Sequence, residues 1–239
     1  MPRWSRYNRG RKDALRFQAK DANSRIGMRI IAGKFRGRKL KSPPSLQTRP
    51  TSDRLRETLF NILAPRIEGA RFLDLCAGTG AVGIEALSRG AAHVTFVDQS
   101  REMCALIEAN LEALEVDEDE LEIVSAEASE FLRRRAARTK PSLSITPRRL
   151  PARGPRLVAL LPRSQPFDII FFDPPYAADY EVVLNYIGEH AARLIAEVGI
   201  LIVEHDKKKG PREEAGRLRR YRVVKQGDSA LSFYERTAA

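Results

Sequence analysis

The chain has 239 residues, 43% of them hydrophobic, and a formal net charge of +11. A chain of this length can bury one α/β core. Its two cysteines, Cys76 and Cys104, are too few for a disulfide framework and lack the spacing of a zinc site. No apolar run approaches the roughly 20 residues of a membrane span. These features exclude a disulfide scaffold and a membrane-spanning protein, and they predict a metal-free protein of the cytoplasm.

The positive charge is concentrated at the N-terminal end. Residues 1–49 hold 15 Lys or Arg against only Asp13 and Asp21, so the rest of the chain is near neutral. This concentration favours a nucleic-acid partner, because each neutralised phosphate releases counterions. A solvated basic tail without a specific partner is the alternative. Residues 1–27 are predicted to form a disordered basic leader.

The first patterned segment follows this leader. Alternation from Met28 to Leu40 predicts a short hairpin within an N-terminal extension, residues 28–50. Its basic residues are expected on the exposed face, where they are predicted to contact the nucleic acid: Arg29, Lys34, Arg36, Arg38 and Lys39. After Pro50, Thr51 or Ser52 can cap a helix. The apolar face of that helix consists of Leu55, Leu59, Phe60 and Leu63.

The main domain, residues 51–239, then alternates strands and helices. Strands are expected at 71–75, 93–98, 121–124, 167–172, 199–204, 222–224 and 231–234. Helices are expected at 81–89 and 101–114, in a stretch that ends at Leu132, and at 180–195. This order is typical of a doubly wound α/β fold. Residues 133–166 carry ten Lys or Arg, six Pro and no acid, and are predicted to be a disordered cationic insertion.

A glycine-rich loop follows the first strand of the main domain. Residues 78–83, Gly-Thr-Gly-Ala-Val-Gly, satisfy G-x-G-x-x-G, so a dinucleotide site is one interpretation. Gly78 and Gly80 allow a sharp turn and close approach of a ligand. Asp98 ends the next strand, where it can accept hydrogen bonds from a ribose. Asp74 suits a methionine ammonium better than a pyrophosphate, which favours S-adenosylmethionine. Glu127 is a candidate acceptor for the adenine amine or a surface residue.

The most informative motif is Asp173-Pro174-Pro175-Tyr176, at the end of the apolar run 167–172. Two prolines donate no backbone hydrogen bonds and hold the turn rigid, so this turn offers acceptors without donors. Such a site suits an exocyclic amine on an aromatic ring, and Tyr176 can stack on the base. The motif predicts methyl transfer to an amine held about 3 to 3.5 Å from the methyl carbon. A rigid turn without chemistry is the alternative.

With these motifs, the chain resembles the bacterial 16S ribosomal RNA guanine-N2 methyltransferases, which act on guanine 966. The resemblance rests on residues 28–33, 49–51, 54–63, 74–83, 173–176 and 227–231. It implies a Rossmann-like class I methyltransferase fold: a central seven-stranded, mostly parallel sheet whose last strand is antiparallel, plus the N-terminal hairpin.

The resemblance also implies the ligands. S-adenosyl-L-methionine is the implied donor, and the implied substrate is 16S rRNA within the small ribosomal subunit or its assembly intermediate. Arg49 and Arg54 are implied to border the cofactor and the RNA entry. Three departures are Cys76 in place of a common aromatic residue, the leader and the insertion. A monomer is expected.

Two other functional classes remain open. The same site could methylate adenine-N6 in DNA or RNA, or a glutamine amide in a protein, although the terminal signatures argue against both. A non-catalytic RNA-binding assembly factor with a methyltransferase fold is the second class, and the intact Asp74, Asp98 and Asp173 disfavour it. A nicotinamide enzyme would leave residues 173–176 unexplained.

Overall fold

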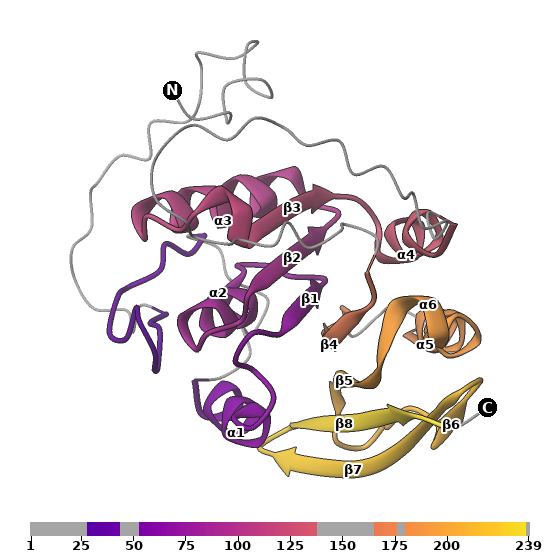
Figure 1. Ribbon diagram of the computed structural model, residues 1–239. Coiled ribbons are helices and arrows are strands. Elements are labelled where there is room, and N and C mark those ends of the chain that lie inside the picture. Colours follow the sequence, from indigo (N-terminus) through magenta and orange to yellow (C-terminus); the bar gives the residue numbers. More distant parts are fainter. Residues whose placement is uncertain (1–27, 44–52, 138–164, 176–179, 238–239) are drawn as a thin grey trace.

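The computed structural model describes residues 28–43, 53–137, 165–175 and 180–237. Several predicted features lie outside these ranges: the leader, residues 138–164 of the insertion, Arg49, the candidate helix caps Thr51 and Ser52, and Tyr176. The described residues form one sheet with helices on both of its faces (Figure 1). This arrangement is the predicted doubly wound α/β fold.

The sheet has eight strands in the order β3-β2-β1-β4-β5-β8-β7-β6. They are β1 (Arg71–Leu75), β2 (His93–Asp98), β3 (Leu121–Ser125), β4 (Phe167–Phe172), β5 (Ile195–Asp206), β6 (Glu214–Ala215), β7 (Leu218–Gln226) and β8 (Ser229–Arg236). The first five pair in parallel, and β8 is antiparallel to both β5 and β7. The predicted antiparallel last strand is therefore confirmed. The predicted count of seven misses β6, a strand of two residues.

Six helices of the described chain cover this sheet in two layers. They are α1 (Asp53–Leu63), α2 (Ala81–Ser88), α3 (Arg101–Ala113), α4 (Ala128–Ala137), α5 (Tyr180–Glu189) and α6 (Ala191–Leu194). One core cluster joins α1, α2 and α3 to the sheet, and a second joins α4, α5 and α6 to its other face (Figure 1). The predicted face of α1 is confirmed, because Leu55, Leu59, Phe60 and Leu63 are all buried.

Several predicted boundaries need correction. Helix α4 continues through Ala137, so residues 133–137 belong to a helix and not to the insertion. The single helix predicted over 180–195 is two helices separated at His190. Strand β5 begins four residues before the predicted Gly199 and pairs irregularly with β4 between Phe167 and Ile169. Strand β7 is longer at both ends than the predicted 222–224.

The predicted N-terminal hairpin is a compact loop closed by one antiparallel bridge, Arg29 to Lys39. It packs on α2 through two buried polar residues. The Glu85 carboxylate accepts hydrogen bonds from the backbone amides of Ile31 and Ala32 at 2.8 and 3.0 Å. Ser88 accepts from the backbone amide of Phe35 at 3.0 Å. The loop is therefore fixed to the main domain.

The sheet order places two strand ends side by side that are far apart in sequence. Strand β1 pairs with β2 on one side and with β4 on the other. The chain therefore leaves β1 and β4 in opposite directions, which opens a crevice at their carboxyl ends. The glycine-rich loop follows β1, and Asp173 follows β4. The fold thus brings both sequence motifs to one edge of the sheet.

Candidate functional site

The loop between β1 and α2 turns through three residues with left-handed backbone conformation. Cys76, Gly78 and Gly80 have φ angles of 64°, 52° and 74°. The Ala77 amide donates to the Val97 carbonyl at 2.9 Å, which fixes the loop to β2. A Cβ added at Gly78 would meet nothing within 4 Å, whereas one at Gly80 would lie 2.8 Å from Ile107. Gly80 is needed for packing, and Gly78 faces open space where a ligand can approach.

Asp74 is a buried acid that connects β1 to α2. Its side chain accepts a hydrogen bond from the Gly83 amide, in the first turn of α2, at 2.8 Å. Burial, opposed by this hydrogen bond and assisted by the charge of Asp98, raises the Asp74 pKa to about 7. A second oxygen is left to accept from another donor. A cationic donor would lower this pKa and stabilise the ionised form.

Asp98, at the end of β2, holds the glycine-rich loop with one oxygen and the start of α3 with the other. Oδ2 accepts from the Gly78 amide at 2.8 Å, and Oδ1 accepts from the Ser100 amide at 2.8 Å. A carboxylate has about four acceptor positions, so two remain. The predicted ribose acceptor therefore also positions the loop that would surround the cofactor.

Glu127 is exposed and caps α4. Its carboxylate accepts from the Ser129 amide at 3.1 Å, the Ser129 hydroxyl and the Glu130 amide at 3.2 Å. The Ser129 hydroxyl is the main cause of a lowered Glu127 pKa. These capping hydrogen bonds account for a carboxylate at position 127 without a bound ligand, and one acceptor position of the carboxylate is left.

Asp173 and Pro174 continue β4 beyond its last pair with β1. The Asp173 amide donates to the Leu75 carbonyl at 3.3 Å, so the motif begins directly beside the strand that carries the glycine-rich loop. Pro174 is buried, and Pro175 is exposed. Burial, together with the charges of Glu204 and Asp74, raises the Asp173 pKa well above its usual range.

Cys76 marks the point where the predicted acids converge. Burial is the main cause that raises its thiol pKa to about 12, and the charges of Asp98, Asp173, Asp74 and Glu127 add to it. All four carboxylates therefore act on one side chain at the β1 end. The fold brings together acids from three strand ends and one helix cap. Within the described ranges, no cluster of three or more His, Cys, Asp or Glu is arranged to hold a metal ion.

Glu204, on β5, is a site residue that sequence reasoning missed. Its side chain is buried, and its charge raises the pKa of Asp173. The pairing of Phe172 with Val203 places it beside Asp173. The only sequence signal was an acid near the end of an apolar strand, and the partner strand becomes known only from the sheet order.

The basic residues predicted to contact RNA lie on the hairpin loop and α1. Arg29, Lys34, Arg36, Arg38 and Lys39 are all exposed, as predicted. Lys34 pairs with Glu120 at 2.8 Å, and Arg38 donates a hydrogen bond to the Ala113 carbonyl at 2.8 Å. These contacts connect the exposed loop to the C-terminal end of α3 and to the acidic residues Glu118–Glu120, which directly precede β3.

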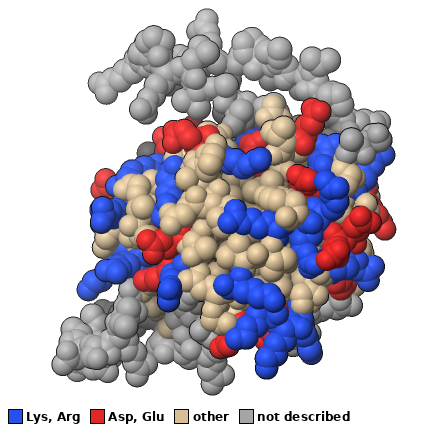
Figure 2. Space-filling model, turned by 90° about the horizontal axis from the view of Figure 1, so that it is seen from below, with Lys and Arg blue, Asp and Glu red and all other residues tan. Residues whose placement is uncertain are grey.

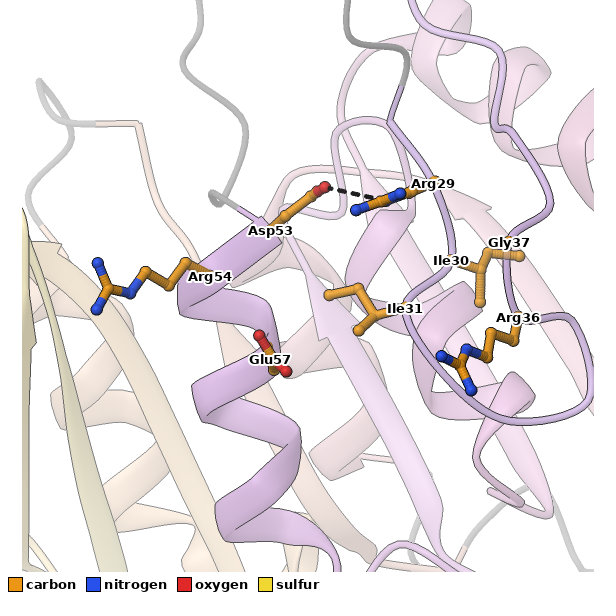
Figure 3. Close-up of a pocket in the computed structure, with 8 residues that line it drawn as sticks. All are labelled: Arg29, Ile30, Ile31, Arg36, Gly37, Asp53, Arg54 and Glu57. Carbon is orange, nitrogen blue, oxygen red and sulfur yellow. Dashed lines mark ion pairs between the residues drawn. The ribbon is translucent and has the colours of Figure 1, made fainter.

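A pocket of about 440 Å³ separates this loop from α1 (Figure 3). Its lining consists of Arg29, Ile30, Ile31, Arg36, Gly37, Asp53, Arg54 and Glu57. The side chains of Ile31 and Arg36 extend toward α1, and that of Glu57 extends toward them, whereas Arg54 points to the other side of the helix. Arg29 pairs with Asp53 at 3.9 Å.

The pocket lies next to the glycine-rich loop. The hydroxyl of Thr79 donates to the sulfur of Met28 at 3.4 Å, one residue before Arg29. On the other side, the buried Arg56 donates to the Arg29 carbonyl at 2.6 Å and to Asp53 at 2.9 Å. The segment that lines the pocket therefore also contacts the candidate cofactor loop.

The face that carries α1 and β7 is mixed in charge. Seen from below, it shows Lys and Arg groups spread over the surface with Asp and Glu between them (Figure 2). The ion pairs made by residues of β7 include Arg219 with Glu235 and Arg220 with Glu213. Among the described residues, no helix has the length and apolar composition of a membrane span.

The sheet order, the glycine-rich loop and the acids at the ends of β1, β2 and β4 define a class I methyltransferase fold. The Escherichia coli structure called "Putative methyltransferase yhhF" has this fold: it superimposes with a TM-score of 0.69 at 30% identity, covering 89% of this chain and 99% of that one.

Residues 28–147 and 154–235 match the family described as "Conserved hypothetical protein 95", and the chain belongs to that family. Two curated relatives are each 32% identical. They are "Putative rRNA methyltransferase YlbH" of Bacillus subtilis, over 87% of this chain and 99% of the relative, and "Ribosomal RNA small subunit methyltransferase D" of Escherichia coli K12, over 88% and 91%.

Proposed function

We propose that the protein transfers a methyl group from S-adenosyl-L-methionine to the N2 amine of guanine 966 in 16S rRNA. The observation that carries this proposal is the position of Asp173 and Pro174 directly beside the glycine-rich loop of β1. The loop for the methyl donor and the groups that accept hydrogen bonds from the amine would then lie at the same crevice. The E. coli relative named for the small ribosomal subunit supports the choice of RNA. The substrate would be the subunit or its assembly intermediate, and the protein would act as a cytoplasmic monomer.

The residues of the crevice fit an adenosine-containing sulfonium cofactor. Gly78 leaves open space beside the loop, and Asp98 keeps two acceptor positions for ribose hydroxyls. The free oxygen of Asp74 would accept from the methionine ammonium, directly or through water, and Glu127 would accept from the adenine amine. When bound, the cofactor supplies an activated methyl group.

The residues after β4 would hold the substrate amine. The Asp173 carboxylate and the Pro174 carbonyl accept hydrogen bonds from the two N2 hydrogens, which favours a more pyramidal and nucleophilic nitrogen. Methyl transfer would form the N–C bond as the bond from the methyl carbon to the donor sulfur breaks, and one of the two N2 protons would leave to Asp173 or to water. Pro175 keeps the turn rigid, and Tyr176 would stack on the base. Catalysis then comes mainly from positioning.

RNA would be bound by the basic residues around the pocket and by the neighbouring segment. This set consists of Arg29, Lys34, Arg36, Arg38, Lys39, Arg49 and Arg54. Phosphate contacts of this kind orient the RNA without reading its sequence. The rigid attachment of the hairpin loop to α2 would fix the distance between these contacts and the crevice.

The direct test is methyl transfer from labelled S-adenosylmethionine to purified, undermethylated small ribosomal subunits, followed by nucleoside analysis of the RNA. N2-methylguanosine at position 966 is expected. Transfer to DNA or to a protein amide, with none to the subunit, would replace the proposed substrate. Cofactor binding without transfer to any acceptor would favour the assembly-factor alternative.

The affinity for S-adenosylmethionine is expected to fall as the pH falls through about 7. Asp74 must be ionised to accept from an ammonium, and its pKa in the free protein is about 7. Protonation below that value removes the charge, so binding weakens at low pH and reaches its full strength above it. Calorimetric titrations between pH 5.5 and 8.5 measure this. Asp74→Asn should bind more weakly at high pH and lose the dependence; an unchanged profile would refute the ammonium role.

Replacing Arg36 and Arg54 by alanine is expected to weaken RNA binding and its salt dependence together. Each lost phosphate contact should reduce the slope of log affinity against log salt by roughly 0.7 to 0.9. Filter binding of 16S rRNA at several salt concentrations gives the slope. Arg193→Ala, on α6 at the other face of the sheet, is the matched control and should leave the slope unchanged. Equal slopes for the double variant and the control would exclude these two arginines from the RNA surface.

A further inference from the structure

Three consecutive lysines, residues 207–209, form a turn directly after β5, and we call this segment the lysine turn. Strands β4 and β5 are parallel, so both end at the edge of the sheet that carries the crevice. Phe172, the last residue of β4, pairs with Val203, whereas β5 continues to Asp206. Three further residues at about 3.3 Å each carry the end of β5 roughly 10 Å beyond the end of β4. The lysine turn therefore borders the place where Asp173 leaves β4.

Hydrogen bonds on two sides hold the backbone of the lysine turn. Asp206 accepts from the Lys208 amide through its carboxylate at 2.7 Å and from the Lys209 amide through its carbonyl at 3.1 Å. On the other side, the Lys207 amide donates to the Asp228 carbonyl at 3.0 Å, in the turn between β7 and β8. The Lys207 ammonium also pairs with the Asp228 carboxylate at 3.1 Å. Lys207 thus attaches the turn to the sheet.

The lysine turn also contacts the segment that follows the Asp-Pro-Pro motif. Helix α5 is the next element after this motif and begins at Tyr180, whose hydroxyl donates to the Lys209 carbonyl at 2.9 Å. In the sheet, β4 lies between β1 and β5. A base held at Asp173 would therefore have the glycine-rich loop on one side and the lysine turn on the other.

The ammonium groups of Lys208 and Lys209 are available for a ligand. Both side chains are exposed, and within the described ranges neither takes part in an ion pair. Two acids of the same region are already engaged, because Asp206 accepts from the Lys208 amide and Asp228 pairs with Lys207. Two cations on a fixed backbone at the rim of the crevice suit an anionic ligand.

An RNA that presents one base to Asp173 brings its phosphates to the same crevice. Asp74, Asp98 and Asp173 lie there and repel phosphates, so the RNA backbone needs cations at the rim. The hairpin loop packs on α2, on the β1 side of the crevice. We infer that Lys208 and Lys209 bind the phosphates that flank the target nucleotide, as a second RNA contact on the β5 side. The inference rests on the proposed function and adds a binding site to it.

The test compares the double variant Lys208→Ala/Lys209→Ala with wild-type protein on undermethylated small subunits. The variant keeps every backbone hydrogen bond of the lysine turn. Its KM for the subunit should rise roughly 3- to 30-fold, the range of two exposed charge pairs, while the single-turnover rate at saturating subunit stays unchanged. Affinity for S-adenosylmethionine, measured by calorimetry, should also be unchanged, because β4 separates the lysine turn from the glycine-rich loop.

Filter binding of naked 16S rRNA at several salt concentrations gives a second readout, which a structural role would not move. Loss of two phosphate contacts should reduce the slope of log affinity against log salt by roughly 1.4 to 1.8. Lys208→Arg/Lys209→Arg keeps both charges and should retain the wild-type slope and KM. The matched control is Arg193→Ala/Arg217→Ala, which removes two exposed cations, one directly before β5 and one directly before β7. This control should also retain the wild-type values.

Equal KM and equal salt slope for the lysine-to-alanine variant and the arginine control would overturn the inference. A raised KM on subunits with an unchanged slope on naked rRNA would overturn it as well, because the lysines would then contact a protein of the subunit. Wild-type protein that forms no N2-methylguanosine would instead overturn the proposed function, and the salt slope would still decide whether Lys208 and Lys209 bind RNA.

Discussion

Asp173→Ala is expected to lower kcat by on the order of 100- to 10,000-fold while S-adenosylmethionine still binds normally. The carboxylate would hold the amine in line with the methyl group, and nothing in the described cofactor loop hydrogen bonds to its side chain. The Asp173 amide, which joins β4 to β1, is kept in the variant. The loss should therefore appear in turnover and leave the fold unchanged.

Asp173→Asn separates charge from position. The asparagine keeps an oxygen acceptor but cannot take a proton, and its amide would face the substrate amine if it turned. Single-turnover rates on small subunits, with cofactor affinity measured by calorimetry in the same buffer, compare the two variants. Turnover near the wild-type level in both would exclude Asp173 from the reaction.

The pH dependence of wild-type turnover follows from the same group. Burial and the charges of Glu204 and Asp74 raise the Asp173 pKa, and only the ionised form is a full acceptor for the amine. Activity should therefore be present above this raised pKa and fall as the pH drops through it. In Asp173→Asn, the residual turnover at saturating S-adenosylmethionine should lack this acidic limb, because the titrating group at position 173 is gone.

The positions of most strands were predictable because buried parallel strands are continuous apolar runs. Residues 167–172 are such a run, and β4 has the predicted bounds. The prediction for β5 began too late because exposed Glu197 and Val198 interrupt its apolar pattern, and the pairing with β4 is irregular there. A local run of apolar residues predicts a strand, but it does not predict an irregular extension of that strand.

The candidate site was predictable only where its residues follow one another in sequence. The glycine-rich loop and residues 173–175 are contiguous signals, and the sheet order brings them together. Glu204 gains its meaning from pairing with β4, and Glu85 from contact with the hairpin loop 53 residues earlier. Such long-range contacts leave no local periodicity. The sequence shows Glu127 only as an acid before a helix, and its hydrogen bonds to Ser129 and Glu130 are visible only in the structure.

Asp98→Ala is expected to weaken S-adenosylmethionine binding by on the order of 10- to 100-fold, the value of a hydrogen bond to a charged group. The substitution removes the ribose acceptor and also releases the amides of Gly78 and Ser100. Part of the loss would then come from a loosened loop. Asp98→Asn should loosen the loop less than Asp98→Ala, because an amide oxygen can still accept from one of these two groups.

Calorimetric titration with S-adenosylmethionine and with methylthioadenosine, which keeps the ribose but lacks the amino-acid part, distinguishes this role from that of Asp74. Asp98 variants should lose affinity for both ligands by a similar factor, since both carry the two hydroxyls. Asp74→Asn should lose affinity only for the ligand with an ammonium. Equal affinity of Asp98→Ala and wild-type protein for methylthioadenosine would refute the ribose assignment, and the loop contacts of Asp98 would then be its whole function.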